Sequence, residues 1–472
     1  MRYRIVRACV PLIPLLLPAL PALALDYSLH YTVRDEIIQV SLCGAEAAAQ
    51  RRFIVDPGAG ANLRDVRRRS GGPLVAEGDA WLAPDWSADD CLDYRADLGR
   101  IADRRREDVG WRIAAPGGDS DLVTSPQQWL LDTAHPGDAT VRLDLPSGYV
   151  WSAPWRHDGD GRYRIPPSPR DWAANLAVGR FPRRDLRLGG DALQLALPGV
   201  RDAATADKLA QWLAAVGRAA RSAYGRLPQA QVQVLALPVG RGGGAVRFGQ
   251  SSRGQGHGLL LLIDPSRPLA EFRDDWTAVH EFAHLFHPYL GDGGRWLGEG
   301  LATYWQEVLR ARAGLLAPTQ AWARLAAGFA RGRRETRGDL SLAQASDRML
   351  HERAFQRVYW TGAAWWLQAD VALRRRSGGR LGVADALLRF RDCCLAEARE
   401  WSPQDFVARL DALLGVDEFL TRYRAAAART DFPDLAPTWT ALGIRVTDDG
   451  SLHFAADAAA ADLRVDIMGG AP

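Results

Sequence analysis

The sequence predicts an α+β protein in which an antiparallel β domain, a mixed α/β domain and a helical domain follow one another. Three observations lead to this prediction. Hydrophobic residues alternate with period two up to about residue 188, the period becomes helical after Gly189-Gly190, and residues 317–429 are almost entirely of helical pattern. The 472 residues exceed one ordinary domain, and 47% hydrophobic with 24% charged residues is typical of a globular chain.

Residues 1–24 have the pattern of a secretory signal peptide. Three arginines within the first seven residues precede an apolar run from Val10 to Leu20, and Ala22-Leu23-Ala24 supplies small residues for cleavage. The run is short for a membrane span and is interrupted by three prolines. We therefore expect an exported, periplasmic or secreted protein without stable membrane insertion.

The net charge and the cysteine content give information about partners and disulfides. A formal net charge of +3 gives no reason to expect nucleic acid as a partner, and nothing indicates an oligomeric state. After removal of the signal, Cys43 and Cys91 lie in one region and form the plausible disulfide pair. The state of the adjacent Cys393 and Cys394 is left open, and the spacing of these four cysteines is not that of a zinc site.

Residues 25–188 predict the antiparallel β domain. Alternating hydrophobic positions such as Tyr27, Leu29 and Tyr31 are separated from the next such run by turn residues. The domain is rich in tryptophan (Trp81, Trp86, Trp111, Trp129, Trp151, Trp155 and Trp172). An aromatic binding platform is conceivable, but large aromatic residues dominate ordinary cores, so we expect core packing.

Residues 189–312 predict the α/β domain. A helix with Leu209 and Val216 on one face follows a cap at Asp202 or Thr205, and strands are expected near Val232–Ala236 and at Leu259–Ile263. Residues 241–258 read as a glycine-rich loop that fits neither a phosphate-binding nor a dinucleotide motif. Residues 313–432 predict a helical domain, and residues 433–472 a short β segment with strands near 444–446, 452–454 and 463–467.

The segment from Asp274 to Tyr304 contains the residues with the clearest chemistry. Hydrophobic residues recur there at helical spacing, so His280 and His284 lie one turn apart on one helix face and can bind the same metal ion. Glu281 lies beside them, where it can take a proton from a metal-activated water. The alternative without a function is an exposed helix that contains two histidines by chance. The chain has only nine histidines, which disfavours this alternative.

A third ligand is expected from the next helix. Pro288 ends the first helix, a glycine-rich loop follows, and a second helix near Trp296 can bring Glu299 back over the histidines. Three protein ligands and one open position are the arrangement of a catalytic site, so the expected cofactor is one Zn²⁺ ion. Asp292 and His287 are alternative ligands, and His287 and Leu290 stand where a metzincin needs glycine and histidine.

HEFAH followed by WLGEGLATYW resembles the gluzincin zinc metallopeptidases. The stretch YWTGAAWWLQADVALRRRSGGRLGVADAL is similar to the YxxGxxxxxxLD…IRxxSGGxxSLDD segment of the glycyl aminopeptidase family, and the resemblance covers about residues 197–429. It implies a thermolysin-like catalytic domain between a β domain and a helical domain. With only about forty residues after the helical domain, the C-terminal PDZ domain common in that family is not expected.

The resemblance also implies roles for individual residues. His280, His284 and Glu299 correspond to the zinc ligands, Glu281 to the general base, and Tyr359 to the tyrosine that stabilises the oxyanion of the intermediate. Thr303 takes the place of a residue that hydrogen-bonds and orients a ligand histidine. We expect the strand with Leu259, Leu260 and Leu261 to pair with the substrate backbone.

These features predict an exported zinc peptidase that acts on a peptide or protein substrate. Gln250, Gln255 and His257 stand where aminopeptidases of this superfamily place an acidic residue for the free amine, so cleavage within peptides and aminopeptidase activity are both left open. A non-catalytic binding module of the cell envelope on the same scaffold, or a zinc hydrolase of a non-peptide amide, are the alternative functions.

Overall fold

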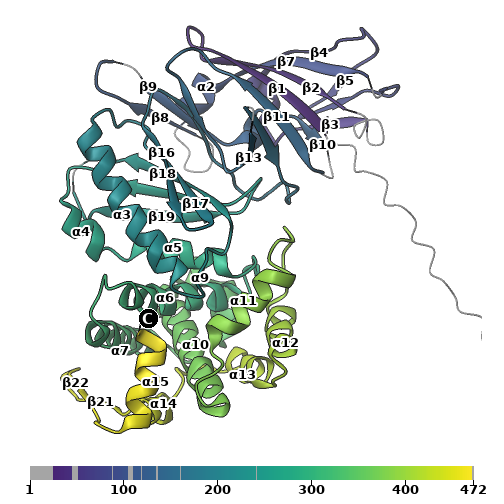
Figure 1. The fold of residues 1–472 in the computed structure, drawn as a ribbon. Helices are drawn as coiled ribbons and strands as arrows, with labels where there is room; N and C mark the ends of the chain where they lie inside the picture. The colour runs from purple at the N-terminus through teal and green to yellow at the C-terminus, as the bar shows by residue number, and fades with distance from the viewer. Residues whose placement is uncertain are drawn as a thin grey trace, which may run out of the picture.

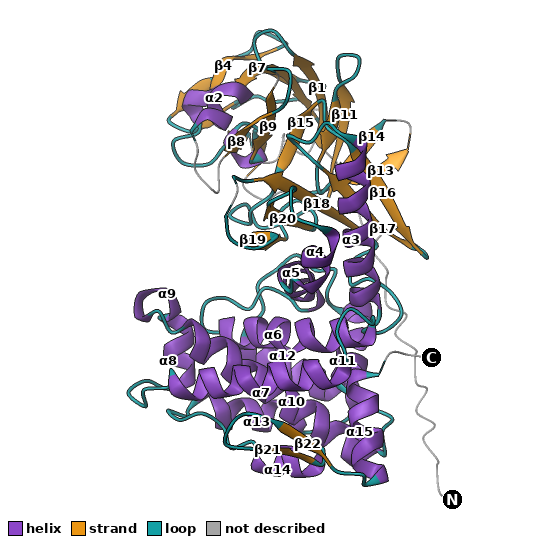
Figure 2. Ribbon diagram, turned by 90° about the vertical axis from the view of Figure 1, so that its left-hand side faces the viewer, coloured by secondary structure: helices purple, strands orange, loops and turns teal. Residues whose placement is uncertain are grey.

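The computed structural model describes residues 25–44, 51–87, 89–104, 110–118, 120–133, 137–159, 161–240 and 242–469. The predicted signal peptide lies outside these residues. Figure 1 shows three stacked regions, a β domain at the top, an α/β domain in the middle and a helical domain below, and Figure 2 shows that the long strands stay in the upper two. The predicted fold class is therefore confirmed.

The N-terminal domain consists of three β-sheets with strand orders β13-β14-β11-β1-β2-β7-β4, β10-β3-β6-β5 and β12-β15-β9-β8. Their bounds are β1 Leu25–Thr32, β2 Ile37–Cys43, β3 Arg52–Ile54, β4 Leu63–Arg68, β5 Val75–Glu77, β6 Ala80–Leu82, β7 Cys91–Asp97, β8 Gly110–Ala114, β9 Ser120–Thr124, β10 Asp132–Thr133, β11 Ala139–Asp144, β12 Val150–Ser152, β13 Arg156–Gly159, β14 Arg162–Ile165 and β15 Leu176–Gly179. A short helix α2 (Leu98–Asp103) and the 3-10 turns Gly60–Asn62 and Pro126–Gln128 complete it. All strand pairs are antiparallel except β1 with β11.

The core of this domain follows the predicted alternation. Tyr27, Leu29 and Tyr31 of β1 point inward while the residues between them are exposed. Trp81, Trp86, Trp129, Trp151 and Trp155 are buried, which confirms core packing for these five tryptophans. Cys43 and Cys91 occupy paired positions of β2 and β7 and form the expected disulfide, and Cys393 is bonded to Cys394.

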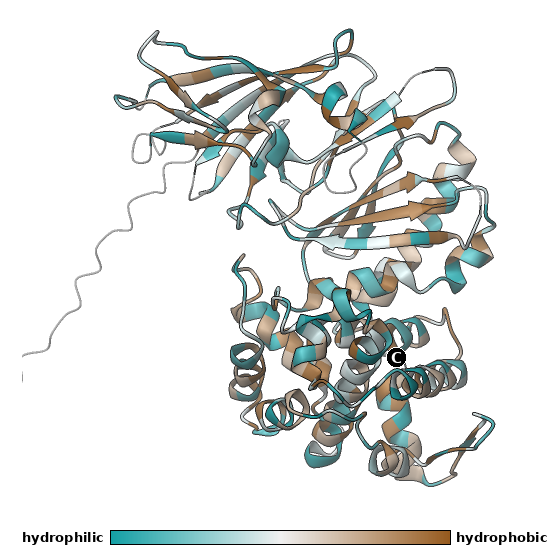
Figure 3. Ribbon diagram, turned by 180° about the vertical axis from the view of Figure 1, so that it is seen from behind, coloured by the Kyte–Doolittle hydropathy of each residue, from teal (hydrophilic) through white to brown (hydrophobic). Residues whose placement is uncertain are grey.

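The middle domain is a five-stranded sheet of order β16-β17-β18-β20-β19 with helices on one face. Its bounds are β16 Arg183–Leu188, β17 Asp191–Ala196, α3 Ala203–Arg221, β18 Gln231–Pro238, β19 Val246–Ser252, β20 Gly258–Ile263, α4 Leu269–Asp274, α5 Thr277–Ala283, a 3-10 turn His284–Phe286 and α6 Arg295–Arg312. Asp202 caps α3 by accepting a hydrogen bond from the Thr205 amide at 2.7 Å. β18 and β20 are largely hydrophobic, and brown strands run through this sheet in Figure 3, whereas the edge strand β19 is half polar.

Two predictions about this sheet are wrong. The sequence pattern predicts that the N-terminal domain extends to residue 188, but all six residues of β16 pair with β17, so this domain ends before Arg183. The glycine content of residues 241–258 predicts a loop, but residues 246–252 form the edge strand β19, antiparallel to β20.

Leu259, Leu260 and Leu261 cannot pair with a substrate as expected. They lie in β20, which is hydrogen-bonded to β18 on one side and to β19 on the other. Leu259 and Leu261 pack against the helices, whereas Leu260 packs against the N-terminal domain. The free edge for strand addition belongs to β19 instead.

The C-terminal region is helical. Its helices are α7 Pro318–Arg334, α8 Leu342–Asp347, α9 Met349–Glu352, α10 Phe355–Ser377, α11 Val383–Cys393, α12 Pro403–Leu414, α13 Glu418–Ala427, α14 Ala436–Ala441 and α15 Ala458–Met468, and β21 (Ile444–Val446) pairs with β22 (Leu452–Phe454). The strand predicted at 463–467 is wrong, because these residues belong to α15. Leu463 and Ile467, four positions apart, are buried on one face, and Val465 is exposed.

Among the described residues, no helix has the length and hydrophobicity that a membrane crossing requires.

Candidate metal centre

The three predicted metal ligands meet in space. His280 lies in α5, His284 opens the 3-10 turn that continues α5, and Glu299 lies in α6. The Nε2 atoms of His280 and His284 lie 3.2 and 3.4 Å from Glu299 Oε2, and the ligand atoms of all three residues lie within 4.8 Å of one another. Ligands on a tetrahedral zinc ion at about 2.1 Å are about 3.4 Å apart. The donor set and its spacing therefore fit zinc.

The ionisation of the cluster favours a cation. Burial on its own would raise the pKa of Glu299, but the nearby His284 and His280 lower it well below the usual range, so its carboxylate is charged. Burial lowers the pKa of His280, and the hydrogen bond and charge of Glu299, with the charge of Glu281, more than offset this and raise it. A proton at His280 Nε2 occupies the place that a metal ion would take.

His280 is held by a chain of polar side chains from α6. Its Nδ1 lies 2.9 Å from Gln306 Oε1, and Gln306 Nε2 donates to Glu307 Oε1 at 2.9 Å. Arg310 in turn donates to Glu307. Because Gln306 must direct its amide nitrogen at Glu307, its oxygen faces His280, which fixes the proton on Nδ1 and leaves Nε2 free for a metal.

Thr303 does not make the hydrogen bond that we expected of it. Its hydroxyl is buried and has no hydrogen-bond partner among the described residues. The partner of His280 is Gln306, seven residues after Glu299 instead of four. Thr303 and Gln306 are three residues apart and therefore lie on the same side of α6.

His287 orients the second ligand. Its Nδ1 donates to the carbonyl of Pro288 at 2.7 Å, and its Nε2 lies 3.2 Å from His284 Nδ1. Burial, with the charges of Arg253 and His284, lowers the pKa of His287 well below its usual value, so the ring is neutral and its Nε2 accepts the proton of His284 Nδ1. Gly298 makes room for this ring, since a Cβ there would lie 2.8 Å from His287 Cε1.

Glu281 projects from α5 between the ligands and the edge strand β19. A Cβ on Gly249 of β19 would lie 2.5 Å from Glu281 Cγ, so glycine at that position allows the strand to approach the carboxylate. Burial raises the pKa of Glu281, which the two ligand histidines partly counteract. The carboxylate therefore holds a proton more readily than an exposed glutamate does.

Tyr359 reaches the site from α10. Its ring stacks on His280 with centroids 5.8 Å apart and planes 6° from parallel. Burial, the charge of Glu299 and a hydrogen bond with it raise the pKa of the phenol, which is therefore protonated at neutral pH. The structure thus brings Tyr359, Glu281 and the three ligands into one cleft, as predicted.

A close helix crossing places Tyr359 and Glu299 together. Gly300 of α6 and Gly362 of α10 are in contact, and a Cβ on Gly300 would lie 2.4 Å from the backbone of Gly362. A Cβ on Gly362 would lie 1.9 Å from the carbonyl oxygen of Trp296. These glycines, one residue after Glu299 and three after Tyr359, allow the two backbones to touch.

The cleft above the ligands has a volume of about 280 Å³ and contains two arginines. Arg253, after β19, donates through Nη2 to the carbonyls of His284 and His287. Arg295, one turn before Glu299, pairs with Asp292. Asp292, the alternative ligand, therefore faces Arg295.

The amides and the imidazole expected near a substrate amine are not all in the cleft. Of these three, Gln250 of β19 lines it. Gln255 Oε1 accepts a hydrogen bond from Trp155 of the N-terminal domain at 3.0 Å. Partial burial of His257, with the charge of Arg253, lowers its pKa to about 3, so it is uncharged at neutral pH.

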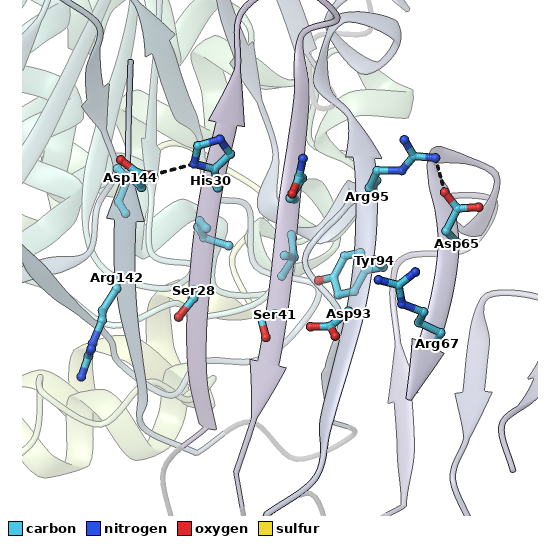
Figure 4. A pocket seen from close by; sticks show the side chains of 14 residues that line it. Ser28, His30, Ser41, Asp65, Arg67, Asp93, Tyr94, Arg95, Arg142 and Asp144 are labelled. Carbon is cyan, nitrogen blue, oxygen red and sulfur yellow. Dashed lines mark hydrogen bonds and ion pairs between the residues drawn. The ribbon is translucent and has the colours of Figure 1, made fainter. Parts of the chain in front are cut away.

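A larger hollow of about 760 Å³ lies on the β domain, far from this cluster in sequence. Figure 4 shows that its lining side chains project from neighbouring strands of the seven-stranded sheet, with ion pairs between His30 and Asp144 and between Arg95 and Asp65. Its walls alternate serine, arginine and aspartate, and the one group of described residues that could hold a metal is in the other cleft. Among the described residues, the group that could hold a metal therefore lies in the smaller cleft.

Comparison with solved structures shows that the fold is that of the M1 zinc metallopeptidases. An aminopeptidase N family protein from Idiomarina loihiensis matches 90% of this chain and 79% of its own length, with a TM-score of 0.64 and 14% identity. An M1 zinc metallopeptidase from Deinococcus radiodurans matches 88% of this chain and 95% of its own, with a TM-score of 0.51 and 19% identity.

Yeast LTA4 hydrolase in complex with bestatin covers 88% of this chain and 69% of its own, at a TM-score of 0.55 and 11% identity. No family model matches the chain, and no curated protein matches it. At these identities the likeness is one of fold, and it confirms the resemblance to zinc peptidases of aminopeptidase type at that level.

The roles of three residues of the site are not predicted in the sequence analysis. Gln306 and His287 orient the ligands, and Arg253 lies in the cleft. His287 could have been found, because it is one of nine histidines and follows a ligand by three residues. Gln306 falls on the helix face of Glu299, two turns later, and a search of that face would have included it.

Proposed function

We propose that the protein is a zinc-dependent peptidase in which Glu281 is the general base. The observation that supports this most strongly is the meeting of two imidazole nitrogens and a carboxylate oxygen at tetrahedral spacing, beside a second carboxylate. A zinc ion on His280, His284 and Glu299 would lower the pKa of a water molecule and polarise the carbonyl that this water attacks.

Glu281 moves the proton. Its raised pKa suits a group that accepts a proton from the attacking water and then releases it to the leaving amine. The carboxylate lies in the cleft with the ligands and next to Gly249 of the edge strand, where a substrate backbone would run. From this position Glu281 can transfer the proton in both steps, from the water and to the leaving amine.

Tyr359 stabilises the charge that develops on the carbonyl oxygen. Its phenol is protonated at neutral pH and faces the same cleft as Glu281 and Glu299, so it can donate a hydrogen bond to the oxyanion. Stacking on His280 restricts the ring to one orientation.

A peptide substrate is favoured by the free edge of β19. Gly249, Gln250 and Ser251 of this strand line the cleft, and an extended peptide can pair with them as an added strand. A Deinococcus radiodurans M1 zinc metallopeptidase variant of the same fold has been solved with a Tyr-Ser-Ala substrate. We also propose export, which is supported by the signal-like pattern of residues 1–24.

The proposal is tested with Glu281→Gln and His284→Ala. Glu281→Gln should keep one zinc ion per chain, measured by elemental analysis, and lose about 10²–10⁴-fold of its activity on a peptide library, because the proton acceptor is gone. His284→Ala should lose zinc and activity together. His351→Ala, at a histidine whose side chain is 86% exposed, serves as the control and should keep both. Hydrolysis at the normal rate by Glu281→Gln would refute the mechanism.

A further inference from the structure

A second cavity of about 450 Å³ lies beside the metal centre, on the other side of Tyr359. It lies between the start of α5, the middle of α6, helix α7 and the start of α10. Its lining includes Trp276, Thr303, Arg324, Arg331, Phe355 and Trp360. Tyr359 lines both this cavity and the cleft, and Trp276 contacts His280 with ring centroids 5.3 Å apart. The cavity therefore adjoins the proposed active site at Tyr359.

The walls of the cavity expose aromatic surface. Trp276 and Phe355 are 43% and 40% exposed, although large hydrophobic side chains of this chain are mostly buried. Trp360 adds a third ring to the lining. Exposed rings around one cavity are typical of a site that binds an apolar group, because its burial removes both surfaces from water.

A buried hydroxyl in this cavity lacks a partner. Thr303 is 2% exposed, and its Oγ1 makes no hydrogen bond to any described residue. A buried polar atom without a partner costs about 1–3 kcal/mol, so a bound molecule toward which the Thr303 side chain turns, and which offers it an N–H or a carbonyl, would be stabilised here. The neighbouring Glu307 accepts hydrogen bonds from Gln306 and Arg310 and makes none with Thr303.

The rim of the cavity is positively charged. Arg331 lies over the ring of Trp360 at 5.0 Å and donates to Gln356, a neutral partner. Arg324 pairs with Asp274, which is also contacted by Arg310. The buried Glu307 is the acid among the lining residues, so the cavity as a whole attracts an anion.

We propose that this cavity is the subsite for the residue that follows the scissile bond, and that it selects a large apolar or aromatic side chain. The substrate carboxylate then lies toward Arg331 and Arg324, and a substrate backbone group bonds to Thr303. The leaving half of a peptide contains its free carboxylate, which is why the cationic cavity belongs to that half. This inference rests on the proposed peptidase function, since it assigns one of its subsites.

The experiment measures binding, which needs no turnover. Calorimetry with the zinc-loaded protein compares phenylalanyl-alanine, alanyl-alanine and phenylalanyl-alanine amide, each a possible product. Burial of the phenyl ring should make the first bind about 10–100-fold more tightly than the second. Loss of the carboxylate in the amide should weaken binding about five-fold or more, and Arg331→Gln should abolish that difference.

Ala327→Trp fills the cavity from α7 and should remove the preference for phenylalanine. Its matched control is Ala330→Trp, at an exposed residue of the same helix that does not line the cavity, and this variant should keep the preference. Equal affinities for the first two dipeptides, or a preference that survives Ala327→Trp, would overturn the inference. A protein without peptidase activity that still shows the preference would refute the proposed function, and with it the assignment to a scissile bond, and would keep the cavity as a binding site for an apolar group with a carboxylate.

Discussion

The two ligand histidines are each fixed at Nδ1 by a residue with no direct part in metal binding. Gln306 accepts from His280, and His287 accepts from His284. Gln306→Leu and His287→Leu should each weaken zinc affinity about 10–100-fold, because such orienting contacts hold the ligand ring and its tautomer. Competition with a chelator measures the affinity. Thr303→Val is the control and should leave it unchanged, since Thr303 makes no hydrogen bond.

Arg253 places a positive charge in the cleft that a substrate amine would approach. Burial lowers the pKa of its guanidinium to about 10, so the group is still charged at neutral pH. A peptide with a free amine next to the scissile bond would bring a second positive charge toward it, whereas an acetylated peptide would not. We expect kcat/KM for acetylated peptides to equal or exceed that for the matched free peptides. Arg253→Gln should raise the free-amine value relative to the acetylated one, and a strict requirement for the free amine would contradict this.

The central residues of the site could be predicted because each depends on spacing within one element or one hairpin. Histidines four residues apart must share a helix face, and Glu299 needs only the return of the next helix. Gln306, by contrast, is one of several polar residues of α6, and its role depends on the rotation of that helix against α5. Arg253 lies in the cleft because β19 and β20 form a hairpin, which the sequence pattern did not indicate.

At the scale of elements, the errors share a cause. β19 (VRFGQSS) is the outermost strand and most of its side chains are at least partly exposed, so it is half polar and its pattern resembles that of a loop. The alternation in residues 183–188 predicts a strand but not the strand with which it pairs, and for this reason it does not show that β16 belongs to the middle sheet. In α15, Leu463, Val465 and Ile467 alternate as in a strand, yet the first and third are also four apart, and Asp457 caps the helix at the Ala460 amide.

The contact between α6 and α10 is the element on which the position of Tyr359 depends. Gly300→Ala should destabilise the protein by about 1–3 kcal/mol, since the new methyl group would overlap the backbone of Gly362. The variant should also have a lower kcat with little change in KM. The reason is that the two helices must move apart, and Tyr359, which lies in α10, then moves away from the metal ligands. Urea unfolding and steady-state kinetics measure the two effects. Gly293→Ala, where a Cβ would meet nothing within 4 Å, is the control, and an equal loss there would argue against the crossing.

At the scale of the molecule, the N-terminal domain covers one face of the five-stranded middle sheet. Val123 and Ala177 of the N-terminal sheet share a hydrophobic cluster with Ala196, Leu235 and Leu260 of the middle sheet. The helices cover the opposite face. Because both faces of β18 and β20 are covered, these strands are hydrophobic throughout, and the edge strand is left as the part of the sheet that a substrate can reach.

One buried carboxylate joins the two domains. Asp121 of β9 is fully buried and accepts hydrogen bonds from the amide of Gly199 at 2.7 Å and from both terminal nitrogens of Arg201 at 2.8 and 2.9 Å. Gly199 and Arg201 belong to the link between β17 and α3, so the contact crosses the domain boundary. Asp121→Asn keeps the shape but replaces an acceptor by a donor, which leaves N–H groups without partners.

We therefore expect Asp121→Asn to lower the free energy of unfolding by about 3 kcal/mol or more, as for a buried ion pair that loses one member. Because the loss falls between the domains, we expect calorimetry to resolve two transitions for this variant and one for the unaltered protein. Asp207→Asn is the matched control: its carboxylate is 62% exposed and 3.5 Å from Arg184, and such a surface pair contributes about 0–1 kcal/mol. A single transition with unchanged stability in Asp121→Asn would show that the hydrophobic cluster alone holds the domains together.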